Sequence, residues 1–165
     1  MQYMRLDTTQ RQALLAELGR MPAWLRDAFS HLSAEQARIG GDDGAFAPVE
    51  QVWHLADLER DGFAFRIDRL MVGSGAALPD FDGTAVAAAR NYRALSLADG
   101  LAAFESARLS NIATLQTIEA PEVWAHSGTQ EGVGAVSLCD MPTFMSQHDA
   151  AHRAEIEAWQ SRVAP

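Results

Sequence analysis

The sequence predicts an all-α protein, a four-helix bundle with one long crossover between its second and third helices. Four segments carry apolar residues at helical spacing, and glycine and proline separate them. No alternating pattern of useful strand length appears, and the connection before the third helix has roughly 25 residues, more than is usual within a bundle. At 165 residues, we expect one domain spanning 1–165.

The first helical segment begins after Asp7, an N-cap residue followed by two threonines. Leucines at positions 14, 15 and 18 form its apolar side. Gly19 and Pro22 interrupt or kink it, and Pro22 fits the start of a second stretch that reaches position 32. Residues 40–44, with the sequence Gly-Gly-Asp-Asp-Gly, predict a loop.

The second helix is expected to begin with Pro48 in its first position and to run to about Met71. An apolar stripe on this helix lies beside a polar stripe that includes His54, Asp57 and Asp61. Such a helix could line a site in the core of a bundle, although the acids could equally face water.

The second half of the chain predicts two more long helices. Residues 73–83 read as irregular and 84–92 as a short helix, after which Ser96 caps a third long helix that stops before Pro121. Residues 122–136 contain three glycines and are predicted to be loop. The last helix begins near Asp140, with Pro142 tolerated in its first turn.

The stretch 148–152, His-Asp-Ala-Ala-His, is the strongest indication of function. Residues four apart lie on one face of a helix, so His148 and His152 could bind one metal ion. His54 would supply a third imidazole from the second helix. Three neutral imidazoles with one open position are the composition of a catalytic zinc site, but imidazole also suits nickel, iron and copper. The glutamate of the HExxH metalloprotease motif is absent.

Composition excludes several other function classes. The net charge of −9 disfavours binding to nucleic acid or to an anionic membrane surface. All 13 basic residues are arginine, which removes lysine Schiff-base chemistry and the phosphate-binding lysine of nucleotide-binding loops. The single Cys139 and the lack of an apolar signal segment fit a cytoplasmic protein.

Three stretches of the chain resemble the DinB-like superfamily. They are residues 53–59 (Trp-His-Leu-Ala-Asp-Leu-Glu), Phe-Asp at 81–82 followed by Tyr92, and residues 147–156 with the His-x-x-x-His pair. The similarity covers nearly the whole chain. The chain departs from the superfamily pattern at Phe46-Ala47, where relatives often carry Trp-Ser, so the usual side-chain N-cap of the second helix is missing.

The resemblance implies a divalent metal ion, often nickel or zinc, on His54, His148 and His152. It also implies a homodimer and a reaction on a small molecule, either hydrolysis or a transferase or isomerase reaction that uses a low-molecular-weight thiol. The alternative is a metal-binding or ligand-binding domain without catalysis, with an accessory role in stress responses.

The remaining polar candidates each have two readings. Asp57 or Asp61 could orient a ligand imidazole or accept a proton, or could be a solvated acid. Asp149 points away from His148 and is expected at the surface or bundle edge. We expect His31 at a helix end, His126 in a loop and Cys139 as an inert buried thiol.

Overall fold

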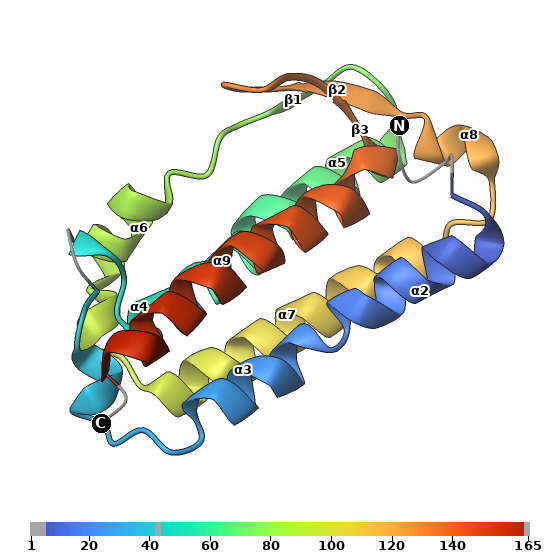
Figure 1. The fold of residues 1–165 in the computed structure, drawn as a ribbon. Coiled ribbons are helices and arrows are strands. Elements are labelled where there is room, and N and C mark those ends of the chain that lie inside the picture. The colour runs from blue at the N-terminus through green and yellow to red at the C-terminus, as the bar shows by residue number, and fades with distance from the viewer. Residues whose placement is uncertain (1–5, 42–43, 164–165) are drawn as a thin grey trace.

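The computed structural model describes residues 6–41 and 44–163, and four long helical rods dominate it (Figure 1). The first rod comprises α2 (Thr8–Leu18) and α3 (Met21–Phe29), and the second comprises α4 (Pro48–Asp57), the π-helix η3 (Leu58–Phe63) and α5 (Ala64–Val72). The third rod is α7 (Leu97–Gln116) and the fourth is α9 (Met141–Val163). The prediction of a four-helix bundle is confirmed. Within the predicted loop at 40–44, Asp42 and Asp43 lie outside the described residues.

The starts of these helices follow the local sequence signals. The Asp7 carboxylate accepts from the Gln10 amide, and the Gln10 side chain accepts from the Asp7 amide, which makes a reciprocal capping box. Ser96 accepts from the Asp99 amide at the start of α7. Ala47 has no side-chain acceptor, so only the Glu50 carboxylate, which accepts from the Ala47 amide at 2.8 Å, caps this end of α4.

The second rod is not the regular α-helix that the sequence predicted. Its middle turn, η3, is a π-helix, which inserts one extra residue into the helical turn. The Glu59 carbonyl accepts from the Ala64 amide and also from the Asn111 side chain of α7 at 3.0 Å. Gly62 lies in this turn, where a Cβ atom would come within 2.5 Å of Leu58 Cδ1. The π-turn follows directly after the turn that carries His54.

A small sheet covers one end of the bundle, contrary to the predictions for residues 73–83 and 122–136. Strand β1 (Ala76–Leu78) pairs in parallel with β2 (Ser127–Gln130), which pairs in antiparallel with β3 (Gly134–Ser137). Gly128 is needed because a Cβ atom there would lie 2.5 Å from the Ala76 carbonyl oxygen. Strands of three or four residues are too short to show an alternation of apolar and polar residues. The prediction of loop from the glycines is therefore wrong.

The shorter helices occupy the connections. These are η1 (Gln36–Arg38), α6 (Gly83–Arg90), η4 (Tyr92–Ala94), α8 (Pro121–Trp124) and η5 (Leu138–Asp140). Helix α6 and η4 pack against α4, so the connection between α5 and α7 runs from the sheet to the opposite end of the second rod (Figure 1). Among the described residues, no helix is long and apolar enough to cross a membrane.

The core consists of two apolar clusters with a polar layer between them. On the second rod one cluster ends at Ala56 and the other begins at Leu58. On α7 the first cluster ends at Phe104 and the second begins at Ile112, and buried Arg108 lies between them. On α9 the pair His148 and His152 falls in the same interval, so the predicted metal ligands belong to this polar layer.

Candidate metal centre

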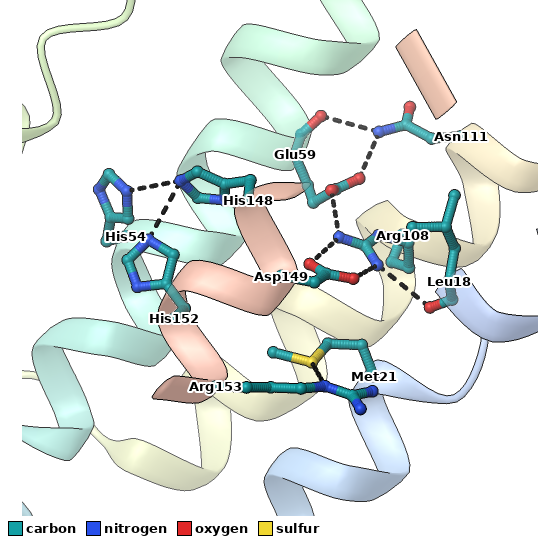
Figure 2. Close-up of polar contacts among 10 residues, drawn as sticks. All are labelled: Leu18, Met21, His54, Glu59, Arg108, Asn111, His148, Asp149, His152 and Arg153. Carbon is teal, nitrogen blue, oxygen red and sulfur yellow. Dashed lines mark hydrogen bonds and ion pairs between the residues drawn. The ribbon is translucent and has the colours of Figure 1, made fainter. Parts of the chain in front are cut away.

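Three histidines from two rods converge at the middle of the bundle (Figure 2). His54 comes from α4, and His148 and His152 come from successive turns of α9. His148 Nε2 lies 3.4 Å from His54 Nε2 and 3.1 Å from His152 Nε2. One potential ligand atom from each residue lies within 4.8 Å of the others. The structure therefore brings together the three residues that the sequence singled out.

The spacing of these nitrogens fits a shared ion. Imidazole nitrogens that bind one zinc ion at about 2.0–2.1 Å in tetrahedral geometry lie about 3.3 Å apart. The two measured Nε2 separations of 3.4 and 3.1 Å bracket that distance. The donor set is therefore suited to a divalent metal ion.

Gln51 fixes the tautomer of His152. The Gln51 side-chain amide donates to Glu155 at 2.8 Å, which leaves its oxygen facing His152 Nδ1. An amide oxygen can only accept, so His152 Nδ1 carries the proton and Nε2 presents its lone pair to the centre of the cluster. Histidine ligands of metal sites characteristically donate their other N–H in this way. Neither Gln51 nor Glu155 was predicted, because the sequence does not show that they face each other across two helices.

Packing positions the Nδ1 side of the His54 ring. Its ring lies against Phe46 and Phe81, with ring centroids 5.6 and 6.0 Å away. A Cβ atom on Gly83, the first residue of α6, would lie 2.4 Å from His54 Cε1. Buried His54 Nδ1 has no hydrogen-bond partner among the described residues.

The environment keeps these imidazoles neutral. Burial, followed by repulsion from His152, lowers the pKa of His54 to about 4. The same two causes, with smaller contributions from His54 and Arg108, lower the pKa of His148 to about 3. Burial also lowers the pKa of His152. Neutral imidazole is the form that binds metal, so the site is ready for an ion at neutral pH.

A cleft of about 320 Å³ opens beside the cluster. His54 and His148 form part of its wall, and three phenylalanines supply much of the remainder. The other lining residues come from the second rod, the β1–α6 connection and the β2–β3 hairpin: Leu58, Arg66, Asp80, Gln130 and Val133. A larger groove of about 610 Å³ lies between α2 and α7, but it contains none of the histidines. The smaller cleft is therefore the one that gives access to the histidine cluster.

A buried ionic network adjoins the cluster on the other side (Figure 2). Arg108 of α7 is fully buried and donates to Asp149 of α9 at 2.6 and 2.8 Å and to Glu59 of η3 at 2.7 Å. It also donates to the Leu18 carbonyl of α2 at 3.1 Å, so one guanidinium of the third rod is hydrogen-bonded to each of the other three rods. Asn111 completes the network by donating to Glu59 at 2.7 Å.

The prediction that Asp149 lies at the surface or bundle edge is wrong. Its side chain is buried and forms a bidentate ion pair with Arg108. The sequence does separate Asp149 from the face of His148, but the side to which it points is occupied by α7. Arg108 itself falls at a helical position that only the packed bundle shows to be buried.

The two predicted catalytic acids pair with arginines, and among the described residues neither forms a hydrogen bond with the three histidines. Asp57 is fully buried in ion pairs with Arg90 and Arg60 and accepts from the Tyr92 hydroxyl at 2.6 Å. Within the described part of the chain no group forms a hydrogen bond with His54 Nδ1, so Asp57 does not orient that imidazole through a hydrogen bond. Asp61 is 52% exposed and pairs with Arg60 at 2.6 Å. Asp61 is therefore a solvated acid, the second of the two readings that the sequence left open.

The remaining candidates lie outside the cleft. His31 is exposed just beyond the end of α3, and His126 donates from Nδ1 to the Leu70 carbonyl at 2.8 Å. Cys139 is a buried thiol in the apolar core. These positions agree with the structural readings that the sequence favoured.

Comparisons with known proteins agree with this fold. A solved structure, described as "YfiT from Bacillus subtilis is a probable metal-dependent hydrolase with an unusual four-helix bundle topology", superposes with a TM-score of 0.86. It shares 18% sequence identity, over 95% of this chain and 89% of the other. No protein with a curated description matches. The model of the DinB superfamily matches residues 11–156, and the chain therefore belongs to the DinB superfamily.

Proposed function

We propose that this protein binds one divalent metal ion through His54, His148 and His152 and uses it to hydrolyse a small organic substrate held in the adjoining cleft. The observation that carries the proposal is the convergence of three neutral imidazoles, of which His152 is buried and His54 and His148 are half-buried, beside a cleft that is open to solvent. The superposed Bacillus protein, described as a probable metal-dependent hydrolase, supports the same reaction class. A bound zinc or nickel ion would supply a Lewis acid and a water molecule of lowered pKa.

The residues of the chain have separate tasks in this reaction. Gln51 holds His152 in the tautomer that leaves Nε2 free, and Glu155 holds the Gln51 amide in turn. The phenylalanines at positions 63, 81 and 144 pack against the apolar part of a substrate and exclude water from it. The transferase or isomerase reaction with a low-molecular-weight thiol remains an expectation from the family resemblance, and it would use the same cleft.

Metal analysis of the purified protein tests the ligand assignment. We expect about one ion per chain in the wild type and a large loss of metal in His54→Ala, His148→Ala and His152→Ala, because each change removes one of three bonds to the ion. His31→Ala is the matched control, since His31 is exposed and distant from the cluster. If all three variants keep full metal, the assignment is wrong.

Activity separates the possible roles of the bound ion. Metal-loaded wild type would be assayed against a panel of small esters and amides, with and without added thiols, beside His152→Ala and His31→Ala. Hydrolysis that is lost only in His152→Ala supports the proposal, whereas turnover that requires a thiol would favour the transferase reading. Stable metal binding without turnover in either set would favour the non-catalytic alternative.

A further inference from the structure

Buried polar atoms without a partner are concentrated at the cleft beside the histidines. Four such side-chain atoms occur among the described residues: His54 Nδ1, Arg66 Nε, Arg108 Nε and Gln130 Oε1. Three of these four residues line the same cleft. Because buried polar groups are nearly always hydrogen-bonded in a folded protein, these three atoms indicate a missing polar partner in the cleft.

Arg66 is the most unusual of the three. It lies on α5 and is only 5% exposed, yet it forms no ion pair within 4.0 Å with any other described residue. Its terminal nitrogen donates a long hydrogen bond of 3.3 Å to the Pro79 carbonyl. Its guanidinium carbon lies 5.9 Å from the centre of the Phe63 ring, which holds the side chain against the cleft wall.

The charge of Arg66 is not compensated by its neighbours. Burial lowers the pKa of Arg66, and the acid that opposes this effect is Asp80, an exposed residue at the same cleft. A buried cation without a close counter-ion is costly, and an anion that enters the cleft would remove that cost. A guanidinium favours carboxylate, phosphate or sulfonate because its planar donors match their oxygens.

Gln130 supplies a second polar group at the same place. It ends strand β2, is 8% exposed and has a buried amide oxygen without a partner. A ligand O–H or N–H beside the anionic group would satisfy that oxygen. The small sheet therefore contributes a recognition group to the cleft in addition to covering the end of the bundle.

We propose that Arg66 and Gln130 bind the anionic end of the substrate, so that the protein acts on small carboxylates or related oxyanions with an apolar body. The apolar part lies against Phe63 and Phe81, and the reacting bond lies toward His54 and His148. This placement of the reacting bond rests on the proposed metal-dependent function. The anion site itself consists only of residues of the chain and can be tested without metal.

Matched probes test the anion site directly. 3-Phenylpropionate, 3-phenylpropan-1-ol and inorganic phosphate would be titrated into metal-free and metal-loaded protein and followed by ¹H–¹⁵N NMR. The Arg66 side-chain Nε–H signal would be assigned by its absence from the spectra of the Arg66→Met and Arg66→Lys variants. We expect the carboxylate to bind at least tenfold more tightly than the alcohol, in both forms of the protein, with a clear shift of the Arg66 signal. Phosphate that binds more tightly than the carboxylate would overturn the choice of an apolar substrate.

Variants separate the role of Arg66 from general effects of charge. Arg66→Met should abolish the preference for the carboxylate, Arg66→Lys should restore part of it, and Asp80→Asn should strengthen binding because it removes a competing negative charge. Arg69→Met is the control, since Arg69 is an exposed arginine three residues further along α5 that does not line the cleft. Gln130→Leu should weaken the binding of a probe that has a hydroxyl next to its carboxylate, such as 3-phenyllactate.

Three results would overturn the anion site. The first is equal affinity for the acid and the alcohol. The second is a preference for the carboxylate that is unchanged in Arg66→Met. The third is carboxylate binding that requires metal and does not depend on Arg66. If Arg66→Met does not fold, the Arg66→Lys variant and the wild-type Nε–H shift still decide. A protein that binds no metal but keeps the preference would refute the proposed function and leave the anion site intact.

Discussion

At the scale of single residues, the position of His54 in the candidate centre depends on the lack of a side chain at Gly83. Gly83 lies so close to His54 that a Cβ atom would come within 2.4 Å of Cε1 and 2.6 Å of Nδ1 of the imidazole. Alanine is favoured over glycine within helices by about 1 kcal/mol. The glycine at the start of α6 therefore leaves room for the His54 ring, although alanine would be the better helix former.

We predict that Gly83→Ala weakens metal binding by at least tenfold while changing the unfolding free energy little. The added methyl group displaces the His54 ring, whereas the helix itself gains from alanine. Metal affinity would be measured by competition with a chelator, and stability by urea unfolding. Gly73→Ala is the control, because a Cβ atom at Gly73 meets no atom within 4 Å. Unchanged affinity in Gly83→Ala would show that His54 does not depend on this contact.

The lowered histidine pKa values predict how stability depends on pH. In the unfolded chain these side chains take up protons near about pH 6.5, whereas His54 and His148 in the folded protein do so only near pH 4 and 3. Between those values the unfolded state binds more protons, so the folded state loses stability as the pH falls. The stability contributed by the neutral imidazoles is complete above about pH 6.5.

We therefore predict that the melting temperature of the metal-free protein falls from pH 7 to pH 5. The fall should be smaller in the His54→Ala and His148→Ala variants. With metal bound, the fall should be steeper, because protons also displace the ion. Melting curves across this range, with chelator and with added metal, provide the measurement. Parallel curves for the wild type and both variants would contradict the assigned pKa shifts.

Sequence reasoning at this scale found the three clustered histidines but not the residues that support them. His148 and His152 are recognisable because helical spacing alone puts them together, and His54 was expected as a third imidazole on the second helix, in agreement with the family resemblance. Gln51, Arg66 and Gly83 have no such signal, since their roles depend on which distant residue faces them. The surroundings of Asp57, one of the two acids considered for orienting an imidazole or accepting a proton, were missed for the same reason: Arg90 and Tyr92, from a different connection, bind its carboxylate.

At the scale of helices and strands, the sequence predicted helix starts better than it predicted short or irregular elements. Proline and capping residues act within one turn, so Asp7, Pro48 and Ser96 mark helix starts without any tertiary contact. The π-turn of η3 depends on packing against α7, and β1 depends on pairing with β2, a segment about 50 residues further along the chain.

Helix α4 offers a test of capping at this scale. Ala47 has the extended backbone of an N-cap residue, with φ −70° and ψ 159°, but no side-chain acceptor. We predict that Ala47→Ser stabilises the protein by about 0.5–1 kcal/mol, because the serine oxygen can accept a free amide of the first turn. Urea unfolding would measure the change, with Ala47→Gly as the control for a change of side chain without an acceptor. A destabilised serine variant would mean that the buried site has no room for the hydroxyl.

At the scale of the whole molecule, the homodimer remains a prediction. The exposed large apolar residues of the described chain are scattered: Ile39, Val72, Leu109 and Val133. Two-fold association is the commonest closed symmetry for a chain of this kind. Light scattering over a range of concentrations should give twice the monomer mass, and a monomeric mass throughout would refute the prediction.

The buried ionic network predicts a large stability effect from one substitution. Arg108→Ala leaves Glu59 and Asp149 buried without their cation, which typically costs about 3–5 kcal/mol. We expect a correspondingly lower urea midpoint. Arg26→Ala is the control, because Arg26 pairs with Glu105 of α7, the helix that also carries Arg108, but both side chains are exposed to solvent, so its loss should cost much less. Similar costs for the two variants would contradict the energetic role of the network.

The reach of Arg108 to all four rods also bears on which packing the chain adopts. Apolar contacts between helices tolerate sliding and rotation, whereas the two terminal nitrogens of this guanidinium find their acceptors only when Leu18, Glu59 and Asp149 lie around one point. A shifted arrangement would leave a buried charge unpaired, so the network penalises the competitors of the native state more than it stabilises that state. A chain with Arg108→Met, Glu59→Leu and Asp149→Leu could therefore be as stable as the wild type yet populate several bundle arrangements, visible as broadened or doubled NMR resonances.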